Sequence, residues 1–163
     1  MIKSRSGKIL LIDNDVLVYL MDNLYTADQF SFKKVVQYLT LSYGRIWISG
    51  YVKDEFLFKG NDRRRSRIIK KVFDDHSSFS DCPIKVGLNE IRLMIGMKDE
   101  DKGEADSLIQ IQKAKSTTTH FFEDIVFLSN DHGALNRAKK LFITTLSYSA
   151  LKSSIQETGI VLP

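Results

Sequence analysis

The chain has 163 residues, of which 43% are hydrophobic and 27% are charged. This balance is that of an ordinary globular protein, and it excludes a disordered chain, a collagen-like chain and a disulfide-rich scaffold. The length predicts a single domain over residues 1–163, long enough to bury a sizeable core.

Basic residues outnumber acidic residues by 24 to 20, so the formal net charge is +4 and the sequence pI is about 9.1. This small excess permits an anionic partner such as nucleic acid but does not require one. Composition alone therefore leaves the choice of partner open.

Cysteine usage and hydropathy bear on where the protein works. Cys82 is the one cysteine, so no disulfide can form within the chain, which suits a reducing compartment. The first residues lack the apolar core of a secretory signal, and no run approaches the ~18–20 apolar residues of a membrane span. We therefore expect a cytoplasmic protein that does not contact a membrane.

Strands and helices alternate along the chain from its N-terminus. Residues 9–12 (ILLI) form a continuous apolar run, as in a parallel strand that is buried on both faces. Asn14 or Asp15 is the natural cap of the helix that follows, and Ser31 that of the next. In chain order, the pattern predicts a strand over 9–12, helices over 16–24 and 31–43, a strand over 45–49, helices over 51–59 and 62–75, a strand over 83–86, helices over 89–97 and 104–116, a strand over 124–128, a helix over 134–141, a strand over 142–146 and a helix over 149–158.

This alternation predicts an α/β fold with a mainly parallel central sheet flanked by helices. Ligands of open parallel sheets bind beyond the carboxyl ends of the strands. The residues that end strands or open the next helix are therefore the candidate site.

Acidic side chains occupy several of these positions. Asp13 and Asp131 follow apolar strands, Glu55 lies on the helix after the second strand, and Asp106 lies near the start of a later helix. Clustered carboxylates repel one another unless a cation neutralises them, and hard oxygen ligands suit Mg²⁺ or Mn²⁺. A structural alternative is that aspartates at these junctions cap helices, and residues 101–104 also fit a capping box that would use Glu104.

Four short segments carry a family resemblance. They are IDNDVL (12–17), SGYVKDE (49–55), GEADSL (103–108) and FLSND (127–131). In this order and spacing they resemble the four motifs of PIN-domain nucleases, and the resemblance runs from residue 9 to about residue 148. It implies a single PIN-like domain that hydrolyses RNA with Mg²⁺ or Mn²⁺, a class common among toxins of toxin–antitoxin pairs. The expected partners are then an RNA substrate, a cognate antitoxin and a second copy in a homodimer.

The matched positions imply roles for individual residues. Asp13, Glu55, Asp106 and Asp131 become the acidic quartet, with Asp13, Asp106 and Asp131 as metal ligands. Glu55 would orient or deprotonate the attacking water, whose pKa a bound ion lowers.

Four further residues are secondary candidates. Asp15 stands where the family often carries Ser, Thr or Asn, so it adds a charge or caps the helix. Glu104 is an additional acid or a capping residue, and Ser129 and Asn130 could position a ligand or phosphate.

A basic run over residues 63–71 lies in the helix predicted at 62–75. Arg63, Arg67, Lys70 and Lys71 share one side of that helix, opposite an apolar stripe. The run is either a solvated face or a surface that binds RNA phosphates without sequence specificity.

Two other functions remain open. Asp13 and Asp15 also fit the Asp-x-Asp motif of haloacid-dehalogenase-like phosphatases, in which Asp13 would be the nucleophile. The second open function is that of a PIN-like scaffold that binds nucleic acid without catalysis. An ion bound between Asp13 and Asp131 would support the nuclease, whereas a phosphate mimic trapped on Asp13 alone would support the phosphatase.

Overall fold

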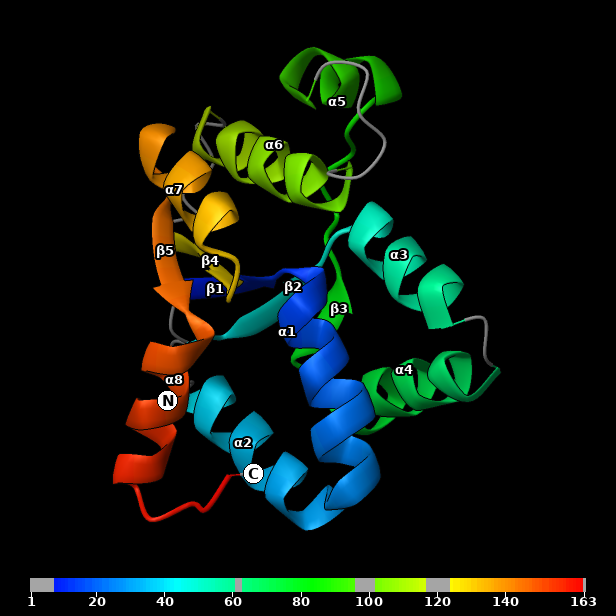
Figure 1. Cartoon of the computed structure of the whole chain (residues 1–163), viewed down its shortest axis with the longest axis vertical. Coiled ribbons are helices and arrows are strands. Elements are labelled where there is room, and N and C mark those ends of the chain that lie inside the picture. Colours follow the sequence, from blue (N-terminus) through cyan, green and yellow to red (C-terminus); the bar gives the residue numbers. More distant parts are fainter. Residues whose placement is uncertain (1–7, 61–62, 96–101, 117–123, 163) are drawn as a thin grey trace, which may run out of the picture.

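Five parallel strands form one sheet in the computed structural model, which describes residues 8–60, 63–95, 102–116 and 124–162. The order across the sheet is β3-β2-β1-β4-β5, with β1 in the centre (Figure 1). The strands are β1 (Lys8–Ile12), β2 (Arg45–Ile48), β3 (Phe79–Asp81), β4 (Asp124–Ser129) and β5 (Thr144–Ser147). The α/β fold with a parallel sheet is thus confirmed.

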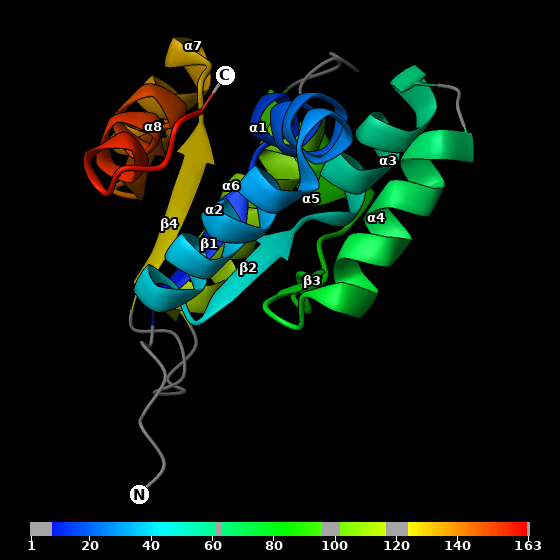
Figure 2. The same cartoon turned by 90° about the horizontal axis from the view of Figure 1, so that it is seen from below.

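Helices cover both faces of this sheet, as Figures 1 and 2 show from two directions. Leu10 and Ile12 of β1 pack into one apolar cluster, while Ile9 and Leu11 pack into another on the opposite face. β1 therefore buries four consecutive residues, because helices cover both faces of a central parallel strand. The helical elements are α1 (Asn14–Val18), the π-helical η1 (Tyr19–Tyr25), α2 (Gln29–Ser42), α3 (Gly50–Gly60), α4 (Arg63–Asp75), α5 (Leu88–Ile95), α6 (Lys102–Ser116), α7 (His132–Lys140) and α8 (Tyr148–Glu157).

The strand expected at 83–86 is wrong, and the third strand lies at Phe79–Asp81. Phe79 is buried and pairs with Ile46, and the Cys82 N–H adds one more bond to the carbonyl of Ile48. Pro83 follows, and because proline has no N–H the chain leaves the sheet there. The last strand also begins later than expected, at Thr144, because Phe142 takes a positive φ of 59° in the preceding turn.

Two helix caps differ from the expected ones. Asp13, not Asn14 or Asp15, caps α1, since its carboxylate accepts the Asn14 N–H. Asp28 caps α2 by accepting from the N–H groups of Phe30 and Ser31, so α2 starts earlier than the apolar spacing indicates. Apolar periodicity gives no signal for the exposed first residues of a helix. Both α1 and α2 therefore begin earlier than the apolar spacing indicates.

Within the described ranges, no helix combines the length and the apolar character needed to cross a membrane.

Candidate functional site

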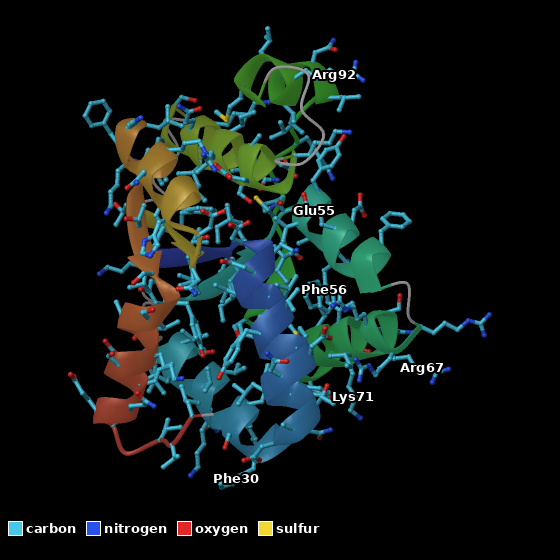
Figure 3. All side chains as sticks on the ribbon, in the orientation of Figure 1. Phe30, Glu55, Phe56, Arg67, Lys71 and Arg92 are labelled. Carbon is cyan, nitrogen blue, oxygen red and sulfur yellow. The ribbon has the colours of Figure 1, made fainter. Side chains whose placement is uncertain are left out.

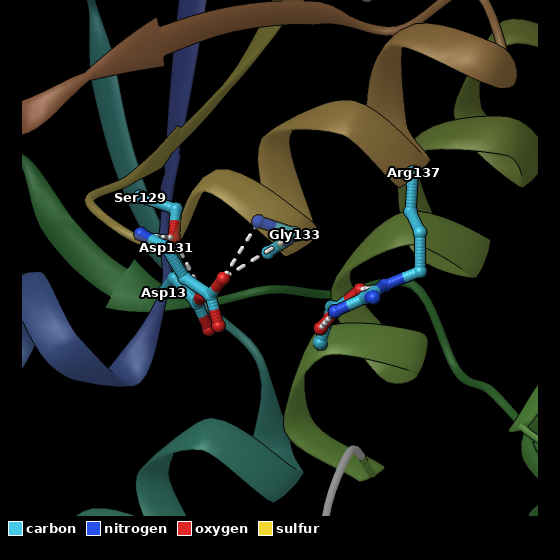
Figure 4. Close-up of polar contacts among 7 residues, drawn as sticks. Asp13, Ser129, Asp131, Gly133 and Arg137 are labelled. Carbon is cyan, nitrogen blue, oxygen red and sulfur yellow. Dashed lines mark hydrogen bonds and ion pairs between the residues drawn. The ribbon is translucent and has the colours of Figure 1, made fainter.

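Asp13 lies at the carboxyl end of the central strand and is 9% exposed. Its backbone N–H donates to the carbonyl of Leu128 at 2.9 Å, which fixes it beside the end of β4. Its carboxylate accepts the Asn14 N–H at 2.9 Å. It also accepts a hydrogen bond from the Ser129 hydroxyl at 2.8 Å (Figure 4). The in-register pairing of β1 with β4 therefore brings Asp13 and Ser129 together.

The pKa of Asp13 is raised to about 7, mainly by burial and then by the nearby negative charges of Asp15 and, less strongly, Glu104. The hydrogen bonds from Ser129 and Asn14 act in the opposite direction, because they favour the charged form. Negative charge thus accumulates around a carboxylate that water does not solvate well. A cation at this position would offset both the desolvation of the Asp13 carboxylate and its repulsion by Asp15 and Glu104.

Asp131 joins this group through the backbone. Its N–H donates to the Ser129 hydroxyl oxygen at 3.1 Å, so Ser129 bridges Asp13 and Asp131. Asp131 also caps α7, where Oδ1 accepts from the N–H groups of Gly133 at 2.8 Å and Ala134 at 3.3 Å. The capping role weighed from the sequence is therefore real for both Asp13 and Asp131.

Asp15 is exposed and connects α1 to the turn after β4. Its Oδ2 accepts the Asn130 N–H at 2.8 Å, and its Oδ1 accepts the Val16 N–H at 2.8 Å. Asn130 in turn accepts a hydrogen bond from the Ser149 hydroxyl at 3.4 Å. The structure thus places Asp15, Ser129 and Asn130 at one edge with Asp13 and Asp131.

Helix α6 contributes Glu104 to this edge. Its carboxylate acts electrostatically on Asp13 and is bound by the Arg137 guanidinium through Nε and, at 2.8 Å, through Nη2. Arg137 was not identified from the sequence, because Glu104 and Arg137 are 33 positions apart and no local pattern relates them. The capping box considered for Glu104 involves Asp101, which lies outside the described residues.

Asp106 points away from Glu104, since residues two positions apart on a helix lie about 200° apart around its axis. Its carboxylate accepts the Tyr51 N–H at 3.1 Å, at the start of α3. Burial raises the pKa of Asp106, and so does the charge of Asp54. Asp106 also lines a cavity of about 530 Å³ together with Gln110 and residues of α3 and of the segment after β3. Of these two α6 carboxylates, Glu104 is the one whose charge raises the pKa of Asp13, whereas Asp106 is bound at the start of α3.

Glu55 holds α3 against the start of α6 (Figure 3). Its Oε1 accepts the Gly103 N–H at 3.0 Å, which satisfies one of the open donors in the first turn of α6. A Cβ at position 103 would lie 2.9 Å from that oxygen, so a larger residue there would displace the Glu55 carboxylate. Glu55 thus positions the turn that carries Glu104.

The basic helix α4 divides its arginines between two roles. Arg63, Arg67, Lys70 and Lys71 are exposed, and Figure 3 shows Arg67 extending away from the fold. Arg65 instead binds Asp22 of η1 at 2.6 Å and donates to the carbonyl of Phe56 at 2.6 Å. The exposed basic face expected from the sequence is therefore present, whereas the contacts of Arg65 stabilise the fold.

Across the described ranges, no group of three or more His, Cys, Asp and Glu side chains is close enough to hold a metal ion as arranged. Comparison with protein-family models and with curated proteins gives no match to this chain. The site is thus defined by its own geometry: carboxylates that follow β1 and β4 or lie on α1 and α6, held by Ser129 and Arg137.

Proposed function

We propose that this chain is a metal-dependent nuclease that hydrolyses RNA phosphodiester bonds with Mg²⁺ or Mn²⁺. The observation that carries the proposal is Asp13, a buried carboxylate at the end of the central strand whose pKa is raised to about 7 beside Asp15 and Glu104. The resemblance of four ordered segments to PIN-domain motifs supports the same chemistry.

The oxygen donors at this edge suit a hard divalent ion. Asp13, Glu104 and Asp131 would hold it after their side chains move closer together than they lie in this structure. A bound ion would lower the pKa of a water molecule and stabilise charge on the scissile phosphate. Ser129 orients Asp13 by donating to its Oδ2 at 2.8 Å, and Glu55 positions Glu104 through the start of α6. Asp15 fixes the turn at Asn130 and adds negative charge.

Mn²⁺ is expected to stabilise the protein against heat, because an ion that binds only the folded site shifts the unfolding equilibrium. At 100 times its Kd the ion should add about 2.7 kcal/mol to the free energy of unfolding. Differential scanning fluorimetry over a Mn²⁺ titration measures this, and Asp131→Asn and Glu104→Gln should reduce the shift. Asp106→Asn should keep it, because the Asp106 carboxylate faces the cavity by α3. An unchanged melting temperature over the whole titration would remove the support for a metal site.

Cleavage is tested by incubating the protein with structured RNAs, with Mn²⁺ and with EDTA. Products that form with Mn²⁺ and disappear with EDTA support the nuclease. RNA binding without products in either condition would instead indicate a non-catalytic scaffold. A phosphate mimic trapped on Asp13 alone would indicate the phosphatase.

The exposed face of α4 is proposed to bind the RNA backbone. Replacing Arg63 and Arg67 with Ala should weaken binding across RNA sequences and flatten its salt dependence by roughly one unit of slope per lost phosphate contact. Filter binding at several salt concentrations measures both quantities, while Mn²⁺ binding should stay unchanged. Wild-type affinity and slope in the double variant would show that this helix face is only solvated.

A further inference from the structure

The cavity of about 530 Å³ beside Asp106 lies beyond the carboxyl ends of β2 and β3, where α3 begins and α6 passes. Asp13, Glu104 and Asp131 are not among the residues that line it, so it is separate from the edge proposed to bind metal. Small-molecule sites have volumes of roughly 300–1,000 Å³ and often lie beyond the carboxyl ends of parallel strands. The cavity therefore has the size and the position of a ligand site.

Gln110 of α6 gives the wall of this cavity an acceptor without a donor. The residue lines the cavity and is 3% exposed, and its Nε2 atom donates to the carbonyl of Ile84 at 3.0 Å. Its Oε1 atom is buried and accepts no hydrogen bond from the residues that the structure describes. A buried carbonyl oxygen without a donor is costly and rare in native proteins. A ligand that supplies an N–H donor would remove this cost.

Two carboxylates lie on the same wall. Asp106 binds the Tyr51 N–H at 3.1 Å, and Asp54 follows Tyr51 by three positions, which places it on the same side of α3. Both carboxylates line the cavity. Lys53 also lines it but forms an ion pair with Asp81 at 3.2 Å. The wall near Gln110 is thus rich in acceptors and negatively charged.

The remaining wall is partly apolar, because the side chains of Leu57, Ile84 and Val86 line it and are half-buried. In the described part of the chain, acidic side chains do not gather closely enough to hold a metal ion. An ammonium or guanidinium group, by contrast, carries several N–H donors and can bind acceptors that lie apart from one another. Its aliphatic stem packs well on apolar surface.

We propose that this cavity binds a small organic cation with an ammonium or guanidinium head and an aliphatic stem. The head would contact the two carboxylates and the Oε1 atom of Gln110, and the stem would contact the three apolar side chains. This proposal does not depend on metal binding or on RNA cleavage, since none of the three proposed metal ligands lines the cavity.

NMR titration of the full chain with butylguanidinium, in EDTA and without RNA, tests the proposal. The side-chain amide of Gln110 and the backbone amide of Tyr51 should shift as the probe binds. Butylurea has nearly the same shape without the charge, and it should bind at least about tenfold more weakly, since hydrogen bonds to charged groups are stronger. Equal affinities for the two probes, or no shift at these amides, would overturn the proposal.

Asp54→Asn is the test variant, because Asp54 is exposed and its replacement should not disturb the fold. We expect it to weaken butylguanidinium binding about tenfold, as does the loss of one charge-assisted hydrogen bond. Asp74→Asn is the matched control, since Asp74 is also exposed but does not line the cavity, and its affinity should stay within about twofold of the wild type. Equal losses in both variants would reduce the effect to general electrostatics and contradict the proposal.

Lys85→Gln separates a site for cations from a site for anions. Lys85 is exposed and lines the cavity, so its ammonium repels a bound cation and attracts a bound anion. Butylguanidinium should bind Lys85→Gln as tightly as the wild type or more tightly. If methyl phosphate binds the wild type more tightly than butylguanidinium does, and loses affinity in Lys85→Gln, the cavity is an anion site and the proposal is wrong.

Discussion

Asp13→Asn is expected to abolish metal-dependent RNA cleavage and at the same time to stabilise the metal-free protein. The amide cannot supply the anionic ligand, so the ion is lost or misplaced. Its Oδ1 can still accept the Asn14 N–H, and its Nδ2 can donate to the Ser129 hydroxyl oxygen, so the fold keeps both contacts. The variant also removes the cost of a buried charge near Asp15 and Glu104.

The sign of the pH dependence follows from the pKa of Asp13, which is about 7 in the folded protein and 3.8 as the reference value. Between these values the folded state holds a proton that the unfolded state has lost, so the free energy of unfolding falls as pH rises. At about 1.4 kcal/mol per pKa unit, the loss from pH 4 to pH 7 is of the order of 4 kcal/mol. The stability gained by Asp13→Asn should therefore grow over this range and level off above pH 7.

Urea unfolding in EDTA at several pH values measures this difference. Asp28→Asn is the matched control, because Asp28 also caps a helix but its pKa is lowered, first by the Ser31 hydroxyl hydrogen bond. That variant should gain no stability between pH 4 and 7. Wild-type cleavage by Asp13→Asn, or a lower stability than the wild type at pH 8, would contradict the assignment of Asp13.

Arg65→Ala is expected to cause the largest loss of stability among substitutions of the basic residues of α4. Arg65 binds Asp22 at 2.6 Å, and the two side chains are 14% and 15% exposed. It also donates to the carbonyl of Phe56 and lies 4.7 Å from the centre of the Phe56 ring. Removing one partner of such a pair leaves the other charge poorly solvated, which costs about 3–5 kcal/mol.

Arg67→Ala, two positions along the same helix, is the control for this result. Arg67 is exposed, so its loss should change the free energy of unfolding by less than about 0.5 kcal/mol. Adding Asp22→Asn to Arg65→Ala should recover part of the stability, because it removes the unpaired charge. Equal unfolding free energies for Arg65→Ala and Arg67→Ala would show that the Asp22 pair contributes nothing.

Local sequence patterns determined the parts of the molecule that depend on one strand or one helix. The apolar run at residues 9–12 is sufficient for a buried parallel strand, and the residue that ends it is Asp13 whatever the rest of the fold does. The alternation of basic and apolar residues in α4 likewise defines its exposed face, because a helix has a fixed period. Ser129, Asn130 and Asp131 could be placed near Asp13, since neighbouring parallel strands end at the same edge.

Tertiary packing decided the rest of the candidate site. Glu104 and Asp106 both lie in the first turns of α6, and only the packing of α6 against α3 and α7 determines that Asp106 is bound by the Tyr51 N–H and Glu104 by Arg137. The contact of Arg137 with Glu104 and that of Arg65 with Asp22 join segments 33 and 43 positions apart. Such contacts depend on how whole helices are placed on the sheet, and the periodicity of a short segment contains no information about that placement.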